Sequence, residues 1–158
     1  MGRTTELRRA VADAFLPVAE AAGFRPDRRR MPATLTFRRT VGGQVQILEI
    51  QWEKYGRPRF VLDYGACPGG GFAIDGRIFP PEEVFAGWLP GSGRLKPGRG
   101  LGPGAWFRQD RTLLQRLVGR GALRPATEVA AELLALFPEV LRALDDGVRG
   151  PHITPLQP

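Results

Sequence analysis

Three runs of alternating polar and apolar residues, separated by short turns, constrain this fold more than any other feature of the sequence. In the central run, residues 44–53, apolar and polar side chains alternate: Leu48, Ile50 and Trp52 against Glu49, Gln51 and Glu53. Side chains of a strand alternate between the two faces of a sheet, so this spacing predicts a strand with one apolar face. Residues 34–38 and 59–66 repeat the pattern on either side. Successive strands with short connections predict an antiparallel meander.

The connections have the composition of turns. Gly42 and Gly43 separate the first two strands, and glycine readily adopts the positive φ angles of a two-residue hairpin turn. Asp75 and Gly76 predict a second, smaller hairpin over residues 72–79 for the same reason. Residues 87–104 contain seven glycines and three prolines, so we expect a long irregular loop there.

Helical patterns flank the strands at both ends of the sequence. Apolar residues recur three and four positions apart over residues 7–22 and again over residues 129–144, which is the spacing of one helix face. Pro17 and Pro138 lie inside these patterns and predict a kink or a break, because proline removes a helix hydrogen bond. A shorter helical pattern follows Asp110.

We therefore expect one α+β domain over residues 1–150, with an N-terminal helix, an antiparallel sheet of three to four strands and C-terminal helices packed on one face. Residues 151–158 are expected to form a flexible tail. The predicted core combines the apolar faces of the strands and helices: Phe15, Phe37, Leu48, Ile50, Trp52, Phe60, Leu62, Leu133 and Phe137.

Several segments also resemble a known family. Residues 15–24, FLPVAEAAGF, resemble the P-x-L-K-x-x-G-F helix end that opens the bacterial domain-of-unknown-function family 4304. Its following strands are similar to residues 47–52 and 59–65, its tryptophan-bearing segment to Trp106-Phe107, and its closing helix to residues 127–144. The chain lacks the family's lysines and is richer in glycine and proline after its cysteine. The resemblance implies a small α+β domain and carries over no catalytic residue.

The composition excludes several classes of protein. The single cysteine, Cys67, excludes an internal disulfide and a multi-cysteine metal site, and the single histidine, His152, excludes a histidine-rich one. No run of the sequence approaches the roughly 18 apolar residues of a membrane span. We therefore expect a cytoplasmic protein of bacterial composition that uses no metal or cofactor and has no membrane partner.

The polar face of the predicted sheet and the neighbouring loop form the candidate binding surface. Loops on a rigid scaffold often carry recognition residues, and tryptophan and arginine are the side chains that most often anchor interfaces. Lys96 lies in the same loop. The candidate binding residues are Arg38, Gln51, Arg59, Trp88, Arg94, Arg99 and Trp106.

These features favour a non-enzymatic protein-binding module, similar in kind to toxin-neutralising proteins, that exists as a monomer or weak homodimer. The net charge of +7 leaves a nucleic-acid-binding protein as one alternative. An enzyme with its site on the polar sheet face is another. Glu49 and Glu53 do not form a glycosidase pair, because four strand residues span about 13 Å and such carboxylates lie about 5–9.5 Å apart. No catalytic residue is assigned.

Overall fold

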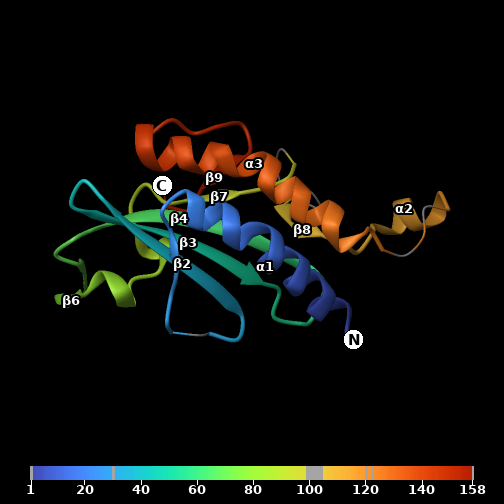
Figure 1. Ribbon diagram of the computed structural model, residues 1–158, viewed down its shortest axis with the longest axis horizontal. Coiled ribbons are helices and arrows are strands. Elements are labelled where there is room, and N and C mark those ends of the chain that lie inside the picture. Colours follow the sequence, from blue (N-terminus) through green and yellow to red (C-terminus); the bar gives the residue numbers. More distant parts are fainter. Residues whose placement is uncertain (1, 30, 99–104, 120, 122, 158) are drawn as a thin grey trace.

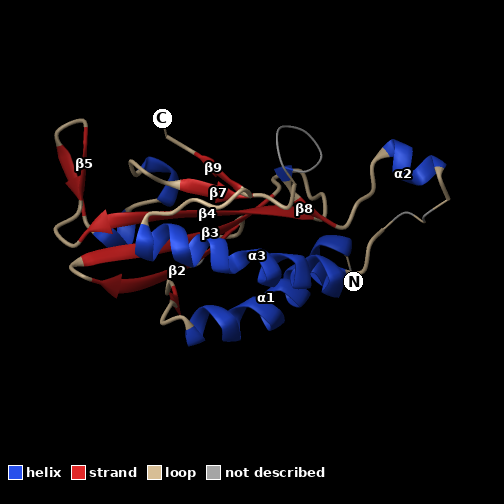
Figure 2. Ribbon diagram, turned by 90° about the horizontal axis from the view of Figure 1, so that it is seen from above, coloured by secondary structure: helices blue, strands red, loops and turns tan. Residues whose placement is uncertain are grey.

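The computed structural model describes residues 2–29, 31–98, 105–119, 121 and 123–157. Two long helices, α1 (Arg3–Ala21) and α3 (Ala126–Asp146), lie side by side on one face of an antiparallel sheet (Figures 1 and 2). This arrangement confirms the α+β class, the N-terminal helix and the antiparallel sheet. Both helices continue through their internal prolines, Pro17 and Pro138, so neither proline ends its helix.

The predicted meander forms the centre of the sheet. Its strands are β2 (Thr34–Val41), β3 (Gln44–Trp52) and β4 (Arg59–Pro68). Gly42 and Gly43 make the turn between β2 and β3 with φ angles of 57° and 78°. The small hairpin also forms, from β5 (Phe72–Ile74) and β6 (Arg77–Phe79), around Asp75 and Gly76.

Within the described ranges the sheet has seven strands, more than the three to four expected. The additional strands are only two or three residues long: β1 (Arg25–Pro26), β7 (Gly93–Leu95), β8 (Phe107–Arg108) and β9 (Ile153–Pro155). Segments this short show no alternating pattern, so sequence periodicity does not predict β1, β7 and β9. The order of the strands is β1-β2-β3-β4-β7-β9, and β8 also pairs with β4.

Two of these strands correct specific expectations. β7 lies within residues 87–104, which were expected to be irregular, and pairs with β4 through Leu62 and Leu95. β9 lies within residues 151–158, which were expected to be a flexible tail, and pairs with β7. Residues 99–104 lie outside the described residues.

The main core lies between the helices and the sheet. All nine predicted core residues belong to a single buried cluster, which confirms the strand register: Phe15, Phe37, Leu48, Ile50, Trp52, Phe60, Leu62, Leu133 and Phe137. A smaller apolar cluster covers part of the opposite face, where Val84, Ala86 and Leu89 pack on Ile47 and Cys67. The covering residues come from the segment around two short 3-10 helices, η1 (Pro81–Glu83) and η2 (Ala86–Trp88). The second face of the sheet is therefore partly buried.

Candidate functional site

The polar residues on this second face gather around the buried carboxylate of Asp63. Arg94 donates from Nε to Oδ1 at 2.6 Å and from Nη2 to Oδ2 at 2.9 Å, and Gln51 donates to Oδ2 at 2.9 Å. Asp63 is 1% exposed. The β4–β7 ladder places Arg94 opposite Asp63 and explains the paired geometry. Two of the candidate binding residues, Gln51 and Arg94, thus hold an internal acid.

A second buried acid, Glu49, lies beside this group. It is fully buried, and its Oε1 has no hydrogen-bond partner among the described residues. The pKa of Glu49 is raised from 4.5 to about 7. Burial is the largest cause and the nearby Asp63 acts in the same direction, whereas the Ala86 N–H, Arg38 and Gln51 lower the pKa.

Arg38 fastens the first 3-10 helix to the sheet. Its Nη1 donates to the carbonyls of Pro81 and Val84 at 2.8 and 3.1 Å, and its Nη2 donates to the carbonyl of Glu82 at 3.2 Å. Its Nε pairs with Asp27 at 3.2 Å. These contacts give the guanidinium group a structural role in the free protein.

The remaining candidate binding residues that the structure describes lie at two separate places, Arg59 with Trp106 at one and Trp88 at the other. Arg59 lies over the Trp106 ring at 4.8 Å and pairs with Glu53 at 3.4 Å. Trp88 lies on η2 against the aromatic side chains of Phe79 and Phe85. Arg99 lies outside the described residues, and Lys96 is buried.

The candidate residues therefore do not form one continuous surface of free side chains. One half of the second face carries four of them: Gln51, Arg59, Arg94 and Trp106. Gln51 pairs with Val61 in the β3–β4 ladder, and Arg59 is two positions from Val61 on the same strand. Arg94 lies opposite Asp63 and Trp106 lies under Arg59. Arg38 lies at the other half, where it holds η1.

Two further titratable side chains, Cys67 and His152, lie outside this group and are packed against other residues. Burial raises the pKa of the Cys67 thiol and keeps it protonated. His152 Nδ1 lies 2.6 Å from the carboxylate of Glu139, a buried residue in the second half of α3. In the part of the chain that is described, His, Cys, Asp and Glu side chains nowhere gather in a group of three or more that could bind a metal ion.

The most exposed apolar residues lie on α2 (Leu113–Leu117), a short helix that stands away from the body of the molecule (Figures 1 and 2). Leu113, Leu114, Leu117 and Val118 are 77, 76, 85 and 70% exposed. Their helical spacing in the sequence is equally typical of a core helix, so the sequence does not reveal their exposure. Isolated apolar residues on a surface are common, but four on one helix form a patch.

An aromatic pocket lies near the opposite end of the molecule, between the β5–β6 hairpin and η2. Trp88 contacts Phe79 with ring centres 5.5 Å apart and Phe85 with ring centres 4.9 Å apart. The cavity has a volume of about 590 Å³ and is lined mainly by apolar side chains: Phe72, Ala73, Ile74, Asp75, Phe79, Trp88 and Gln157. Trp88 is 37% exposed, so its ring is open to a ligand.

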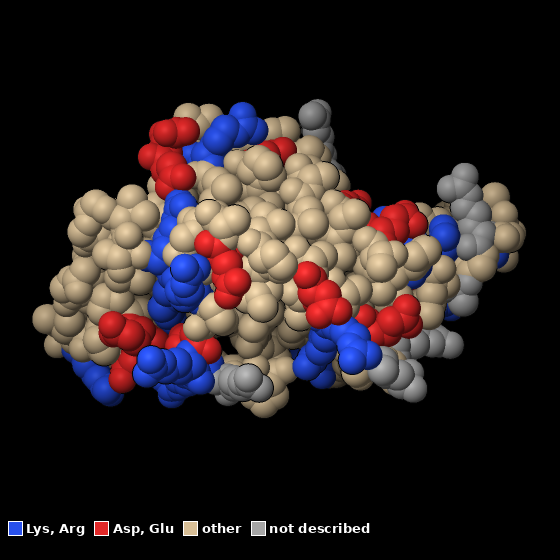
Figure 3. Space-filling model, in the orientation of Figure 1, with Lys and Arg blue, Asp and Glu red and all other residues tan. Residues whose placement is uncertain are grey.

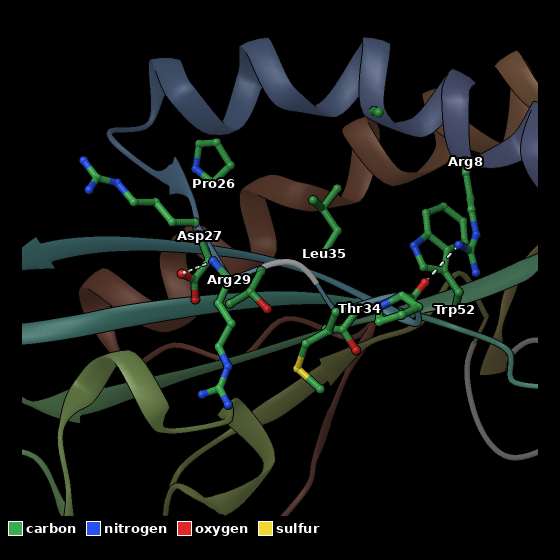
Figure 4. A pocket seen from close by; sticks show the side chains of 12 residues that line it. Arg8, Pro26, Asp27, Arg29, Thr34, Leu35 and Trp52 are labelled. Atoms are coloured by element: carbon green, nitrogen blue, oxygen red, sulfur yellow. Dashed lines mark hydrogen bonds between the residues drawn. The ribbon is translucent and has the colours of Figure 1, made fainter.

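A third feature is a pocket of about 610 Å³ between α1 and the connection from β1 to β2 (Figure 4). Leu35 and Trp52 line its inner side, and Arg8 lies over the Trp52 ring at 5.2 Å while it donates to the Pro32 carbonyl at 2.9 Å. In Figure 4 Arg29 lies on the opposite side of the lining from Arg8. The arginines around this pocket therefore do not converge on one bound group.

Charged residues are unevenly spread over the face that carries the helices. Figure 3 shows groups of basic and acidic side chains on the left and along the lower edge of this face, and acidic side chains also lie near its centre. None of the helices among the described residues combines the length and apolar composition that a membrane crossing requires.

Comparison of the chain with protein-family models, curated proteins and solved structures finds no match in any of the three. The resemblance to domain-of-unknown-function family 4304 therefore rests on the sequence segments alone.

Proposed function

We propose that this chain is a non-enzymatic protein-binding module and that α2 carries its contact surface. The observation that supports this proposal is the exposure of 70–85% at each of the four large apolar residues of the α2 segment. Burying apolar surface contributes about 25 cal/mol per Å², so a protein partner that covers these side chains gains favourable free energy.

The α2 segment is also preorganised for binding. Thr112 and Gln115 form a reciprocal capping box, in which the Gln115 N–H donates to Thr112 Oγ1 at 3.3 Å and the Thr112 N–H donates to Gln115 Oε1 at 3.1 Å. Such caps typically stabilise a helix by about 1 kcal/mol. A helix formed before binding loses less conformational entropy when its partner docks.

The spacing of the exposed side chains fits a groove on a partner protein. Leu113 and Leu117 are four positions apart, as are Leu114 and Val118, so each pair lies on one side of the helix. Helices that bind in grooves use this spacing for their anchor residues. The buried acids Glu49 and Asp63 support an enzymatic function less well, because neither is accessible to a substrate.

The proposal is tested with a partner purified from the source cells and reconstituted with this chain. We expect Leu114→Asp/Leu117→Asp to weaken binding at least tenfold without lowering the melting temperature, because neither side chain packs in the core. Gln115→Glu on the same helix is the matched control. Equal affinity of the double aspartate variant and the unmodified chain would contradict the proposal.

Nucleic-acid binding is the second candidate, favoured by one observation. Arg25, Arg28 and Arg29 are exposed on the segment around β1, where they are available to phosphates. A salt titration of binding to random DNA tests this function, because phosphate contacts weaken steeply as salt rises. Affinity that stays unchanged in Arg28→Ala/Arg29→Ala would contradict it.

A further inference from the structure

We propose that the chain associates head to tail, with α2 of one copy docking in the aromatic pocket of the next. This inference rests on the proposed function, because it names the partner of α2 as a second copy of the same chain. The aromatic pocket is the one lined by Trp88, Phe79 and Phe72.

The aromatic pocket has the properties of a site for apolar anchor residues. It is a shallow, open hollow whose lining includes the aromatic rings of Phe72, Phe79 and Trp88, the type of side chain that often anchors interfaces. Gln157 closes one side of it and donates from Nε2 to the Gly87 carbonyl at 2.7 Å. Ile78, which is 68% exposed on the same hairpin, extends the apolar surface beyond the cavity.

One pair of exposed charges of opposite sign flanks the apolar contacts, Arg116 on α2 and Asp75 at the pocket. Arg116 is exposed on α2 between Leu114 and Leu117. Asp75 is exposed at the tip of the β5–β6 hairpin and lines the pocket. Arg77 on the same hairpin lies over the Phe79 ring at 4.7 Å. A docked α2 can therefore place Arg116 next to Asp75 at the rim while its leucines enter the cavity.

The positions of the two surfaces exclude contact within one molecule. α2 and the β5–β6 hairpin lie at opposite ends of the longest axis, as Figure 1 shows. A contact between two different surfaces is heterologous, so each added copy presents a new free α2 and a new free pocket. Such contacts produce rings or open chains of copies instead of closed two-fold dimers.

Two variants that each damage one surface test this geometry. Leu117→Asp places a charge on the exposed face of α2. Ala73→Arg fills the pocket from an exposed position on β5, where no core contact is lost. Circular dichroism and melting temperature establish that both variants fold.

Sedimentation velocity over a wide range of concentrations gives the result. The unmodified chain is expected to show a weight-average mass that rises with concentration, and each variant alone is expected to remain monomeric. An equimolar mixture of the two variants retains one intact α2 and one intact pocket. The mixture is therefore expected to form a one-to-one dimer and no larger species, and Arg116→Glu is expected to weaken association.

Two outcomes overturn the inference. One is an unmodified chain that stays monomeric at every concentration. The other is association of the unmodified chain without a dimer in the mixture, which would indicate that like surfaces pair. The protein-binding proposal fails separately, when a purified foreign partner binds Leu114→Asp/Leu117→Asp as tightly as it binds the unmodified chain.

Discussion

Glu49 and Asp63 lie opposite each other in the β3–β4 ladder as two buried carboxylates, but among the residues that the structure describes only Asp63 is paired with an arginine. Arg94 directs two donors at Asp63. Burial disfavours the charged form of Glu49, and the pKa of its carboxyl is raised to about 7. The same ladder thus places a carboxyl group paired with arginine beside an acid that favours its protonated form.

Glu49 predicts a pH-dependent stability. Its pKa is higher in the folded state, about 7, than the ordinary 4.5. The folded protein therefore binds more protons between these values, and its stability falls as pH rises from about 4.5 to 7. The shift corresponds to at most about 3 kcal/mol. We expect Glu49→Gln to be the more stable protein near pH 8, measured by urea unfolding.

The exposed acid Glu83 provides the control for this measurement. Glu83→Gln replaces a carboxyl group with an amide in the same way, at an exposed position. A free-energy difference between Glu49→Gln and the unmodified chain that is the same near pH 5 as near pH 8 would argue against a raised pKa at Glu49.

Loss of Arg94 is expected to destabilise the fold. Arg94→Ala leaves the Asp63 carboxylate buried without its two charged donors, which costs about 2–4 kcal/mol. Arg94→Lys is expected to recover only part of this stability, because an ammonium group cannot reproduce the paired geometry of a guanidinium. Chemical denaturation of Arg94→Ala beside the exposed control Arg77→Ala measures the difference. Equal stability of the two variants would show that the pair contributes nothing.

Substitutions in the core strands are expected to lower the free energy of unfolding more than a substitution on exposed α2. Ile50 and Leu62 are fully buried, and replacing either with alanine is expected to cost about 2–5 kcal/mol. Leu114→Ala on exposed α2 is expected to change the free energy of unfolding by less than about 0.5 kcal/mol. An unchanged thermal midpoint in Ile50→Ala would conflict with the register of β3.

Removal of β9 is expected to weaken the sheet and expose β7. Truncation after Gly150 removes the Ile153 side chain from the edge of the core and the hydrogen bond from the Lys96 N–H to the His152 carbonyl. It also leaves β7 with unpaired backbone groups, which favour association between sheet edges. Light scattering during heating is expected to show earlier aggregation of the truncated chain. Identical onset temperatures would exclude a protective role for β9.

The sequence predicted the parts of the fold that local patterns determine. β2, β3 and β4 are long enough to show alternation, and Ile50 and Leu62 consequently lie in the core as expected. β7 and β9 have three residues each, and their place in the sheet depends on partners distant in sequence. Periodicity cannot show such pairings.

The candidate site was less predictable for two physical reasons. Alternation placed Gln51 on the polar face, but it does not reveal that Asp63 binds both Gln51 and Arg94. Helical spacing likewise identifies which face of α2 is apolar, but not whether another element covers it. Leu113 and Leu117 therefore resembled core residues in the sequence and are exposed in the structure.

The pairing of α3 with α1 has a consequence for synthesis on the ribosome. β2, β3 and β4 are complete at Pro68, whereas α3, which covers the same apolar face, begins at Ala126. At about 5–20 residues per second, the ribosome takes roughly 3–11 s to translate residues 69–125. During that interval the nascent sheet has only α1 to shield its apolar face, which makes this period the one in which chaperones have most to bind.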